Sequence, residues 1–259
     1  MAKFDLSFSR PLMNAAGTLG FAPDPRLPVD LSQLGAFLTN PVSLAPRTPA
    51  HSRRCLPCPG GFLLHTGYPN PGLSAVIKRY AQRWTRSPLP IIVHLLGQGV
   101  DDLRSMARRL ESMPGVGGLE LGFPKEVDSA LVSAFTGAAC GELPVIARLP
   151  LDQAARLAPF ALEAGAAAVS LGAPRGALPL PEGGLAQGRL YGPALFPQAM
   201  AAVHSLVQAG IAVIAAGGVY SPAQAQAMLQ AGALAVQLDA ALWRGGLLLG
   251  DAVNVAAAE

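Results

Sequence analysis

Short apolar runs, separated by Gly, Pro and polar residues, recur along the whole chain. Runs of this length, rich in Val, Ile, Leu and Ala, are typical of strands buried on both faces of a parallel sheet. They predict eight strands, over Leu12–Ala15, Ala36–Thr39, Pro90–Leu95, Gly118–Leu121, Pro144–Leu149, Ala167–Leu171, Ile211–Ala216 and Leu234–Leu238. Between most of them the apolar positions follow a helical period, over Leu73–Trp84, Asp102–Ser112, Ala154–Ala164 and Ala194–Ala209.

One junction between helix and strand occurs three times. The segments Glu163–Leu171, Gln208–Ala215 and Gln230–Leu238 each end a helix with Ala-Gly and begin a strand at once. A repeated βα unit is typical of one (β/α)8 barrel, and 259 residues is a normal size for it. We therefore predict a single α/β domain over residues 1–259, with a doubly wound open sheet as the competing arrangement.

The last predicted helix follows a glycine pair. Gly217-Gly218 ends a buried strand, Ser221 can cap the helix, and Pro222 suits its first turn. Free N–H groups at such a turn form a cradle for an anion such as a phosphate.

Composition limits the class of protein. Hydrophobic residues make up 51% of the chain, and the net charge is only +3. Apolar runs are too short for a membrane span, the first residues lack the apolar core of a signal peptide, and the charge is too scattered to indicate nucleic acid. Three cysteines do not make a disulfide framework. We expect a cytoplasmic protein that binds neither membrane nor nucleic acid.

Six segments, taken in order between Pro11 and Leu242, resemble those of one family, the dihydroorotate dehydrogenases. They are Asn14–Gly20, Leu38–Arg47, Gly67–Gly72, Pro144–Leu149, Leu190–Ala194 and Gly217–Val219. The resemblance is to the soluble class of these (β/α)8-barrel, FMN-dependent oxidoreductases of pyrimidine biosynthesis, which act on a CH–CH bond. It implies a small-molecule substrate and a homodimer.

The resemblance also implies a flavin site. Its cofactor-binding positions are Ala15, Ala16, Gly17, Asn40, His94, Arg148, Gly192, Gly217 and Gly218. Arg148 and Asn40 stand where the family has lysines, and His94 where it has an asparagine. Asp239 and Ala240 replace the Gly-Thr that completes the family's phosphate site, and a carboxylate there is expected to repel a phosphate dianion. FMN bound and FMN absent are therefore both open at this stage.

The substrate side departs further from the family pattern. Phe123 occupies the position of the Cys or Ser base and cannot accept a proton. Side chains of other types replace the four asparagines that hold orotate, namely Leu64, Glu120, Lys125 and Ala173. Losing these hydrogen-bonding groups removes the basis of discrimination, so orotate recognition in the family manner is not expected.

Three polar residues at predicted strand ends are the candidate catalytic set. Glu120, His94 and Arg148 should all face the mouth of the barrel, where barrel enzymes carry their active sites. They could perform acid–base chemistry on an anionic substrate; the competing interpretation is a Glu120–Arg148 ion pair that fills an emptied site.

A second group of residues has ligand chemistry. Cys55-Leu-Pro-Cys58, with His51 and His65 on either side, could bind zinc, but Pro57 and Pro59 stiffen what is predicted to be a loop. We predict free thiols and no metal site.

Three functions follow from the sequence. The first is an FMN-dependent oxidoreductase with a diverged substrate site. The second is a non-catalytic paralogue that has lost the base and the flavin. The third is a flavin-free barrel lyase or isomerase that uses Glu120, His94 and Arg148.

Overall fold

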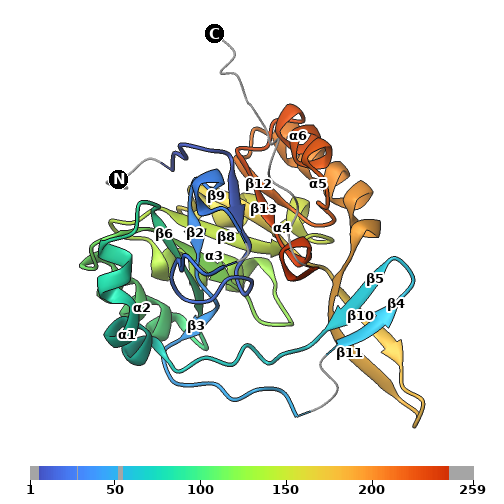
Figure 1. Ribbon diagram of the computed structural model, residues 1–259, viewed down its shortest axis with the longest axis horizontal. Helices are drawn as coiled ribbons and strands as arrows, with labels where there is room; N and C mark the ends of the chain where they lie inside the picture. The colour runs from blue at the N-terminus through green and yellow to red at the C-terminus, as the bar shows by residue number, and fades with distance from the viewer. Residues whose placement is uncertain (1–5, 28, 52–54, 245–259) are drawn as a thin grey trace.

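The structure, a computed structural model, describes residues 6–27, 29–51 and 55–244. Parallel strands form a barrel with helices around its outside (Figure 1). The eight barrel strands are β1 (Leu12–Asn14), β2 (Phe37–Leu38), β6 (Ile91–Leu96), β7 (Val116–Gly122), β8 (Val145–Pro150), β9 (Ala168–Gly172), β12 (Val213–Ala216) and β13 (Ala235–Leu238). All eight predicted strands are confirmed, with ends that shift by a few residues.

The strands follow one another around the barrel in the order of the chain, which excludes the doubly wound sheet. β13 pairs with β1, and a bridge between Met13 and Ala36 joins β1 to the start of β2. The Asn14 side chain strengthens this narrow closure: its Nδ2 donates to the Leu38 carbonyl at 2.8 Å, and its Oδ1 accepts from the Leu38 N–H at 3.0 Å. A short strand, β3 (Val42–Ser43), continues beyond β2 along β6. One buried amide thus adds to the few backbone contacts that close the barrel here.

In the described part of the chain, six α-helices connect the strands, and consecutive helices from α2 onward pack against each other. Their bounds are α1 (Leu73–Thr85), α2 (Val100–Glu111), α3 (Ser129–Ala139), α4 (Ala154–Glu163), α5 (Phe196–Gln208) and α6 (Pro222–Gln230). Short 3-10 helices are η1 (Leu31–Gln33), η2 (Pro193–Leu195) and η3 (Ala240–Arg244). The predicted cap of α6 is confirmed, since Ser221 accepts from the Gln224 N–H and Pro222 opens the helix. Over the described residues, no helix is long and apolar enough to span a membrane.

Two hydrophobic cores lie on the two faces of the barrel wall. The larger fills the space between strands and helices. The smaller is the inner core, made of Met13, Ala36, Leu38, Ile92, Ile146, Ile214 and Ala235, all 1% exposed or less. These apolar side chains fill the barrel interior. Polar residues nearer the carboxyl ends of the strands therefore lie above an apolar layer that excludes water.

A second sheet, which the sequence analysis did not predict, stands at the carboxyl end of the barrel (Figure 1). It consists of two antiparallel hairpins that pair through β5 and β11. Its strands are β4 (Cys55–Cys58), β5 (Gly61–Leu64), β10 (Arg175–Pro179) and β11 (Leu185–Tyr191). β10 begins three residues after β9 ends, so the sheet is tied directly to the barrel mouth.

The structure corrects the prediction of a loop around Cys55 and Cys58. The four residues form β4 at the edge of the second sheet, where a proline such as Pro57 is tolerated because one side of the strand needs no partner. Side chains three positions apart on a strand point to opposite faces, so the sulfurs of Cys55 and Cys58 cannot coordinate the same metal ion. Both thiols are free, and the described residues contain no cluster of three or more metal-ligating side chains.

Candidate functional site

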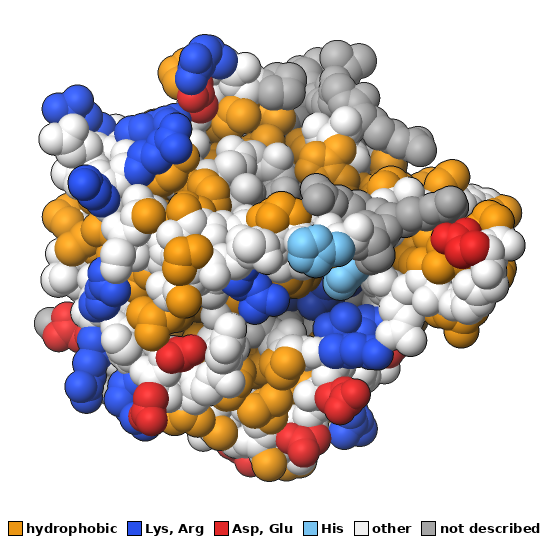
Figure 2. All heavy atoms as spheres, turned by 90° about the horizontal axis from the view of Figure 1, so that it is seen from below, with side chains coloured by type: hydrophobic (Ala, Val, Ile, Leu, Met, Phe, Trp, Pro, Cys, Tyr) orange, Lys and Arg blue, Asp and Glu red, His pale blue; other side chains and the backbone are white. Residues whose placement is uncertain are grey.

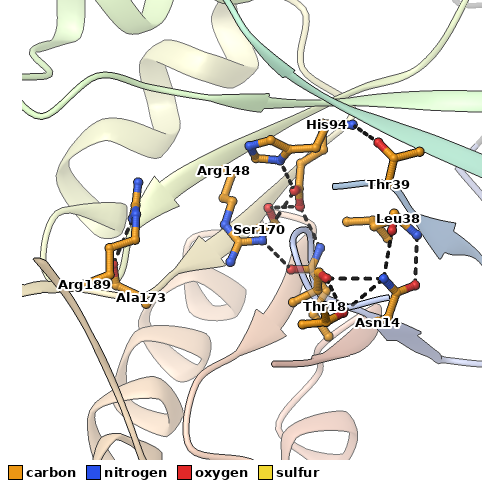
Figure 3. A network of polar contacts seen from close by, with 12 residues as sticks. Asn14, Thr18, Leu38, Thr39, His94, Arg148, Ser170, Ala173 and Arg189 are labelled. Carbon is orange, nitrogen blue, oxygen red and sulfur yellow. Dashed lines mark hydrogen bonds and ion pairs between the residues drawn. The ribbon is translucent and has the colours of Figure 1, made fainter. Parts of the chain in front are cut away.

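A polar network that includes His94, Arg148 and Ser170 lies at the barrel mouth (Figure 3), and one buried carboxylate joins these three side chains. Glu120, on β7, is 0% exposed. Its Oε1 accepts hydrogen bonds from Ser170 Oγ at 2.7 Å and Gln237 Nε2 at 2.6 Å. Its Oε2 accepts from His94 Nδ1 at 2.6 Å and from Arg148 Nη1 at 3.4 Å. Arg148 Nη1 also donates to Gln237 Oε1 at 3.1 Å, which closes the network.

The predicted trio is therefore assembled as one unit, with unequal access to ligands. Glu120 is sealed beneath its partners, whereas His94 and Arg148, with 5% and 9% of their side chains exposed, line the mouth. The expected Glu120–Arg148 ion pair is present. We infer that Glu120 positions the other two residues and that only His94 and Arg148 can touch a ligand.

The network fixes the charge of Glu120. Burial raises the pKa of this carboxyl, but the Arg148 charge and the hydrogen bonds from His94 and Gln237 together outweigh it. The result is a pKa of about 2, so Glu120 is a carboxylate at neutral pH. Arg148 is the cation that balances it: burial lowers the pKa of its guanidinium, but the Glu120 carboxylate, together with Tyr191, Tyr68 and Asp239, outweighs burial and raises it.

His94 is held in the neutral form. Burial lowers its pKa, and this effect together with the Arg148 and Arg189 charges outweighs the attraction of the Glu120 carboxylate. Because Glu120 is ionised, Nδ1 carries the proton that it donates, which leaves Nε2 as an unprotonated acceptor. The backbone N–H of His94 donates to Thr39 Oγ1 at 3.1 Å, which fixes the backbone beneath the ring. His94 can thus accept a proton at Nε2.

Acid is expected to destabilise the protein through Glu120. Its pKa falls from 4.5 to about 2 on folding, so the unfolded chain takes up the proton first. The stabilisation is complete above about pH 4.5 and is lost as the pH falls towards about 2, a difference of roughly 3 kcal/mol. His94, whose pKa is also lowered, adds a loss that begins below its ordinary value of 6.5.

Urea unfolding of the wild type and Glu120→Gln, measured at steps from neutral pH down to about pH 3, checks this. The wild-type free energy of unfolding should fall more steeply in this window, since the variant lacks the titrating carboxyl. Equal slopes for the two proteins would contradict the assigned pKa.

The other predicted cofactor positions lie around the network, on separate turns, and do not form one cluster with it. Ala15, Ala16 and Gly17 form the turn after β1, pinned by the hydrogen bond from Thr18 Oγ1 to the Ala15 carbonyl at 2.7 Å. Asn40 bridges the same turn, since its Oδ1 accepts from the Gly20 N–H at 3.1 Å. Its side chain therefore holds the loops that follow β1 and β2 together.

The predicted glycines lie at the ends of later strands. Gly217 and Gly218 follow β12, both with positive φ, and Gly192 follows β11. Within the described part of the chain, the N–H groups of Gly217 and Gly218 donate to no oxygen. This turn keeps two donors available for an anion.

An aromatic cluster crowds the mouth above the network. Tyr191, only 8% exposed, stacks on Phe62 with ring centroids 5.7 Å apart and meets Trp243 edge-on at 5.4 Å. Ala173 and Ala240 are buried against the same cluster. The cavity between His94, Arg148 and Tyr191 has a volume of only about 20 Å³, room for about one water molecule.

Two members of the network were not among the residues predicted from the sequence. Ser170 and Gln237 are polar residues at the centres of apolar runs, Ala-Val-Ser-Leu and Ala-Val-Gln-Leu. A polar side chain at a position predicted to be buried needs a buried partner. That signal was present in both runs and could have added these residues to the set.

The fold and the site define a class of protein: a (β/α)8 barrel with a charged network at the carboxyl ends of its strands, where barrel enzymes carry their active sites. The model of the dihydroorotate dehydrogenase family matches residues 2–126. Dihydroorotate dehydrogenase B (NAD(+)), catalytic subunit, from Desulforudis audaxviator is 31% identical, over 91% of this chain and 84% of that relative. The protein of the same description from Geotalea daltonii is 30% identical, over 93% of this chain and 88% of its own length.

A solved structure agrees with the sequence comparisons. Dihydroorotate dehydrogenase from Eimeria tenella in complex with ferulenol superimposes with a TM-score of 0.73 at 15% identity, over 94% of this chain and 79% of that one. The chain belongs to the dihydroorotate dehydrogenase family. Members of this family are FMN-dependent oxidoreductases that act on CH–CH bonds.

Proposed function

We propose that this protein is an FMN-dependent oxidoreductase of its family whose substrate is not dihydroorotate. The observation that carries the proposal is the Arg148 guanidinium, held at the barrel mouth by Glu120 and Gln237. Gln237, on β13, lies opposite Ala216, the residue before the Gly217-Gly218 turn, so the residue that holds the cation is on the strand next to the anion cradle. Arg148 itself is on β8, separated from β12 by β9. A fixed cation and a phosphate cradle at the same end of the barrel suit a cofactor that is anionic at its phosphate and gains charge on its ring.

The residues at the phosphate end fit FMN. Gly217 and Gly218 would hold the phosphate through their unused N–H groups. Burial raises the pKa of the Asp239 carboxyl above its ordinary value. Its Oδ1 accepts a hydrogen bond from the Ala240 N–H, so this carboxyl is tied to its own strand end beside the cradle.

At the ring end, the chain contributes charge and orientation. FMN, when bound, supplies an acceptor for a hydride from carbon. Arg148 would hold positive charge beside the reduced ring, and Glu120 keeps its guanidinium in place. His94, with Nε2 unprotonated, is the residue placed to take a proton from a ligand in the mouth.

The substrate differs from dihydroorotate because its recognition groups are missing. Phe123, at the position of the family's base, is 6% exposed and packs against Phe135 with ring centroids 6.2 Å apart. Leu64, at the position of a substrate asparagine, presents no hydrogen-bonding group from β5. A urea-like ring rich in N–H and C=O groups would leave those groups unpaired against such a wall.

A second candidate, a paralogue that works without flavin, is favoured by the aromatic cluster. The cavity of about 20 Å³ at the mouth cannot admit a flavin ring while Tyr191 stays on Phe62 and Trp243. In this candidate the Glu120 network is a buried stabilising unit and Tyr191 replaces the ring. The two candidates therefore differ in whether the Tyr191 side chain leaves the mouth.

Visible absorption of the purified protein, before and after FMN is added, tests the proposal. We expect the spectrum of protein-bound flavin from the wild type, and tighter FMN binding by Tyr191→Ala because the ring no longer has to displace the tyrosine. Tyr80→Ala is the control, since Tyr80 stacks on Phe21 and does not belong to this aromatic cluster.

A colourless wild type that does not bind added FMN, together with a Tyr191→Ala variant that binds it, would favour the second candidate. If neither protein binds FMN, the flavin proposal is wrong.

A further inference from the structure

A large cationic cavity, here called the arginine cavity, adjoins the barrel mouth. Its volume is about 440 Å³. It shares Tyr68, Leu96, Gly122, Arg189 and Tyr191 with the small cavity above the Glu120 network. Figure 2 shows Lys, Arg and His side chains gathered around a hollow on this face of the molecule. Its charged lining residues are Arg47, Lys125, Arg175 and Arg189, with His65 beside them and no Asp or Glu among the described residues.

Two of the cations are forced together by the second sheet. Arg175 on β10 and Arg189 on β11 are direct cross-strand partners. Like charges at directly opposed positions destabilise a sheet. Burial lowers the pKa of Arg175, and the Arg189 charge lowers it further. This pair is costly to keep unless an anion lies between or beside the two guanidinium groups.

Within the described residues, no hydrogen bond or ion pair joins the four cations to a carboxylate, although the more distant Asp152 charge raises the pKa of Arg175. The hydrogen bonds of the other three cations go to neutral oxygens. Lys125 Nζ donates to Gln187 Oε1, Arg189 Nη1 to the Ala173 carbonyl at 3.0 Å, and Arg47 Nε to the Gly67 carbonyl at 3.3 Å. Each of these groups keeps further N–H donors, since an ammonium has three and a guanidinium five. The cavity therefore presents several uncommitted charged donors to a ligand.

The backbone beside the cavity is strained. Tyr68 has a φ of 52°, and it is the only residue other than glycine with positive φ in the described chain. A bulky residue in the left-handed region is a genuine outlier, and strain of this kind persists where the surrounding structure requires it. Here it places the Tyr68 ring under Arg189, whose Cζ lies 5.9 Å from the ring centroid. The strain holds a flat aromatic surface next to the cations.

Part of the cavity lining is apolar. It is formed by Leu64, Leu96, Phe123 and Phe135, which include the two positions where the family's base and a substrate asparagine have been replaced. Leu64 is the cross-strand partner of Arg189, so apolar and cationic side chains lie side by side. This combination predicts a ligand with an apolar ring or chain and a strongly anionic group.

We propose that the arginine cavity binds the substrate of this protein, and that this substrate is a small molecule with at least two negative charges on an apolar body. The charged group is a phosphoryl group or a pair of carboxylates, because both match the planar, bidentate donors of arginine. The inference rests on the proposed function only in calling the ligand a substrate. The binding itself depends on no flavin.

Isothermal titration calorimetry on the purified full chain tests the charge requirement with three ring compounds. Phenyl phosphate carries a phosphoryl group, phthalate carries two carboxylates, and benzoate carries one. We expect at least one of the two dianions to bind at least tenfold more tightly than benzoate, with an affinity that weakens as salt is added. Preference for phenyl phosphate identifies a phosphoryl ligand, and preference for phthalate a dicarboxylate. No binding, or equal binding of all three compounds, overturns the proposal.

Charge-removing variants locate the site. Arg175→Gln and Arg189→Gln should each weaken binding of the preferred dianion by at least tenfold. Arg156→Gln, on the exposed surface of α4, should leave it unchanged. Because Arg175→Gln removes a like-charge pair, its melting temperature should equal or exceed that of the wild type. A lower melting temperature with unchanged dianion binding would show that Arg175 serves the fold alone and would overturn the assignment.

These results separate the two proposals. If the protein binds a dianion through its arginines but does not bind FMN, this inference is supported and the flavin proposal is wrong. A flavin-bound protein that binds no dianion would do the reverse.

Discussion

Replacing Glu120 with glutamine is expected to destabilise the folded protein by roughly 3–5 kcal/mol, the usual effect of removing one partner of a buried ion pair. Both carboxylate oxygens accept two hydrogen bonds each, from Ser170 and Gln237 on one side and from His94 and Arg148 on the other. An amide NH2 at either position would face two donors. The variant would also leave the Arg148 guanidinium buried without a counterion.

Chemical unfolding of Glu120→Gln beside Glu126→Gln measures this effect. Glu126 is an exposed residue of the loop after β7, so its loss of charge should change the free energy of unfolding by less than about 0.5 kcal/mol. A loss of less than about 1 kcal/mol in Glu120→Gln would mean that the network does not hold the barrel mouth together.

The second large effect is expected at the glycine pair. In Gly218→Ala, the new Cβ would lie 2.3 Å from the Phe196 backbone nitrogen, in a residue whose φ is +72°. Neither the start of α5 nor the strained backbone can yield easily, so we expect a loss of roughly 3–5 kcal/mol. In Gly217→Ala the nearest atom, the Ala199 Cβ, is 3.5 Å away, and only the cost of a φ of +106° remains, roughly 1–3 kcal/mol.

Thermal unfolding of both variants checks the order. The comparison also separates two roles that the sequence could not distinguish. Gly218 is required by the close approach of α5, whereas Gly217 has space above it and is the better candidate for contact with an anion. Equal losses from the two variants would contradict this division.

Much of the barrel could be predicted because its strands are buried on both faces. Val213–Ala216 reads as an unbroken apolar run, Ala235–Leu238 as a run interrupted only by Gln237, and Ser221-Pro222 marks the start of α6 in the sequence itself. The second sheet gave a weaker signal. β4 contains Pro57, and β10 and β11 are only partly buried, so neither the apolar-run rule nor propensity detected them.

The candidate site divides in the same way. His94, Glu120 and Arg148 could be placed together because each lies near the carboxyl end of a predicted barrel strand. The arginine cavity could not be anticipated, because Arg175 and Arg189 meet only through the pairing of β10 with β11. The stacking of Tyr191 on Phe62 depends on the same unpredicted sheet.

Anaerobic addition of dihydroorotate to the FMN-loaded protein, with the flavin absorbance followed over time, tests most directly whether the substrate site has diverged. The flavin should stay oxidised, because Phe123 cannot take the substrate proton and Leu64 offers the ring no hydrogen bond. Dithionite, added afterwards, should bleach it and show that the flavin can be reduced. Bleaching by dihydroorotate alone would contradict the claim that the substrate site has diverged.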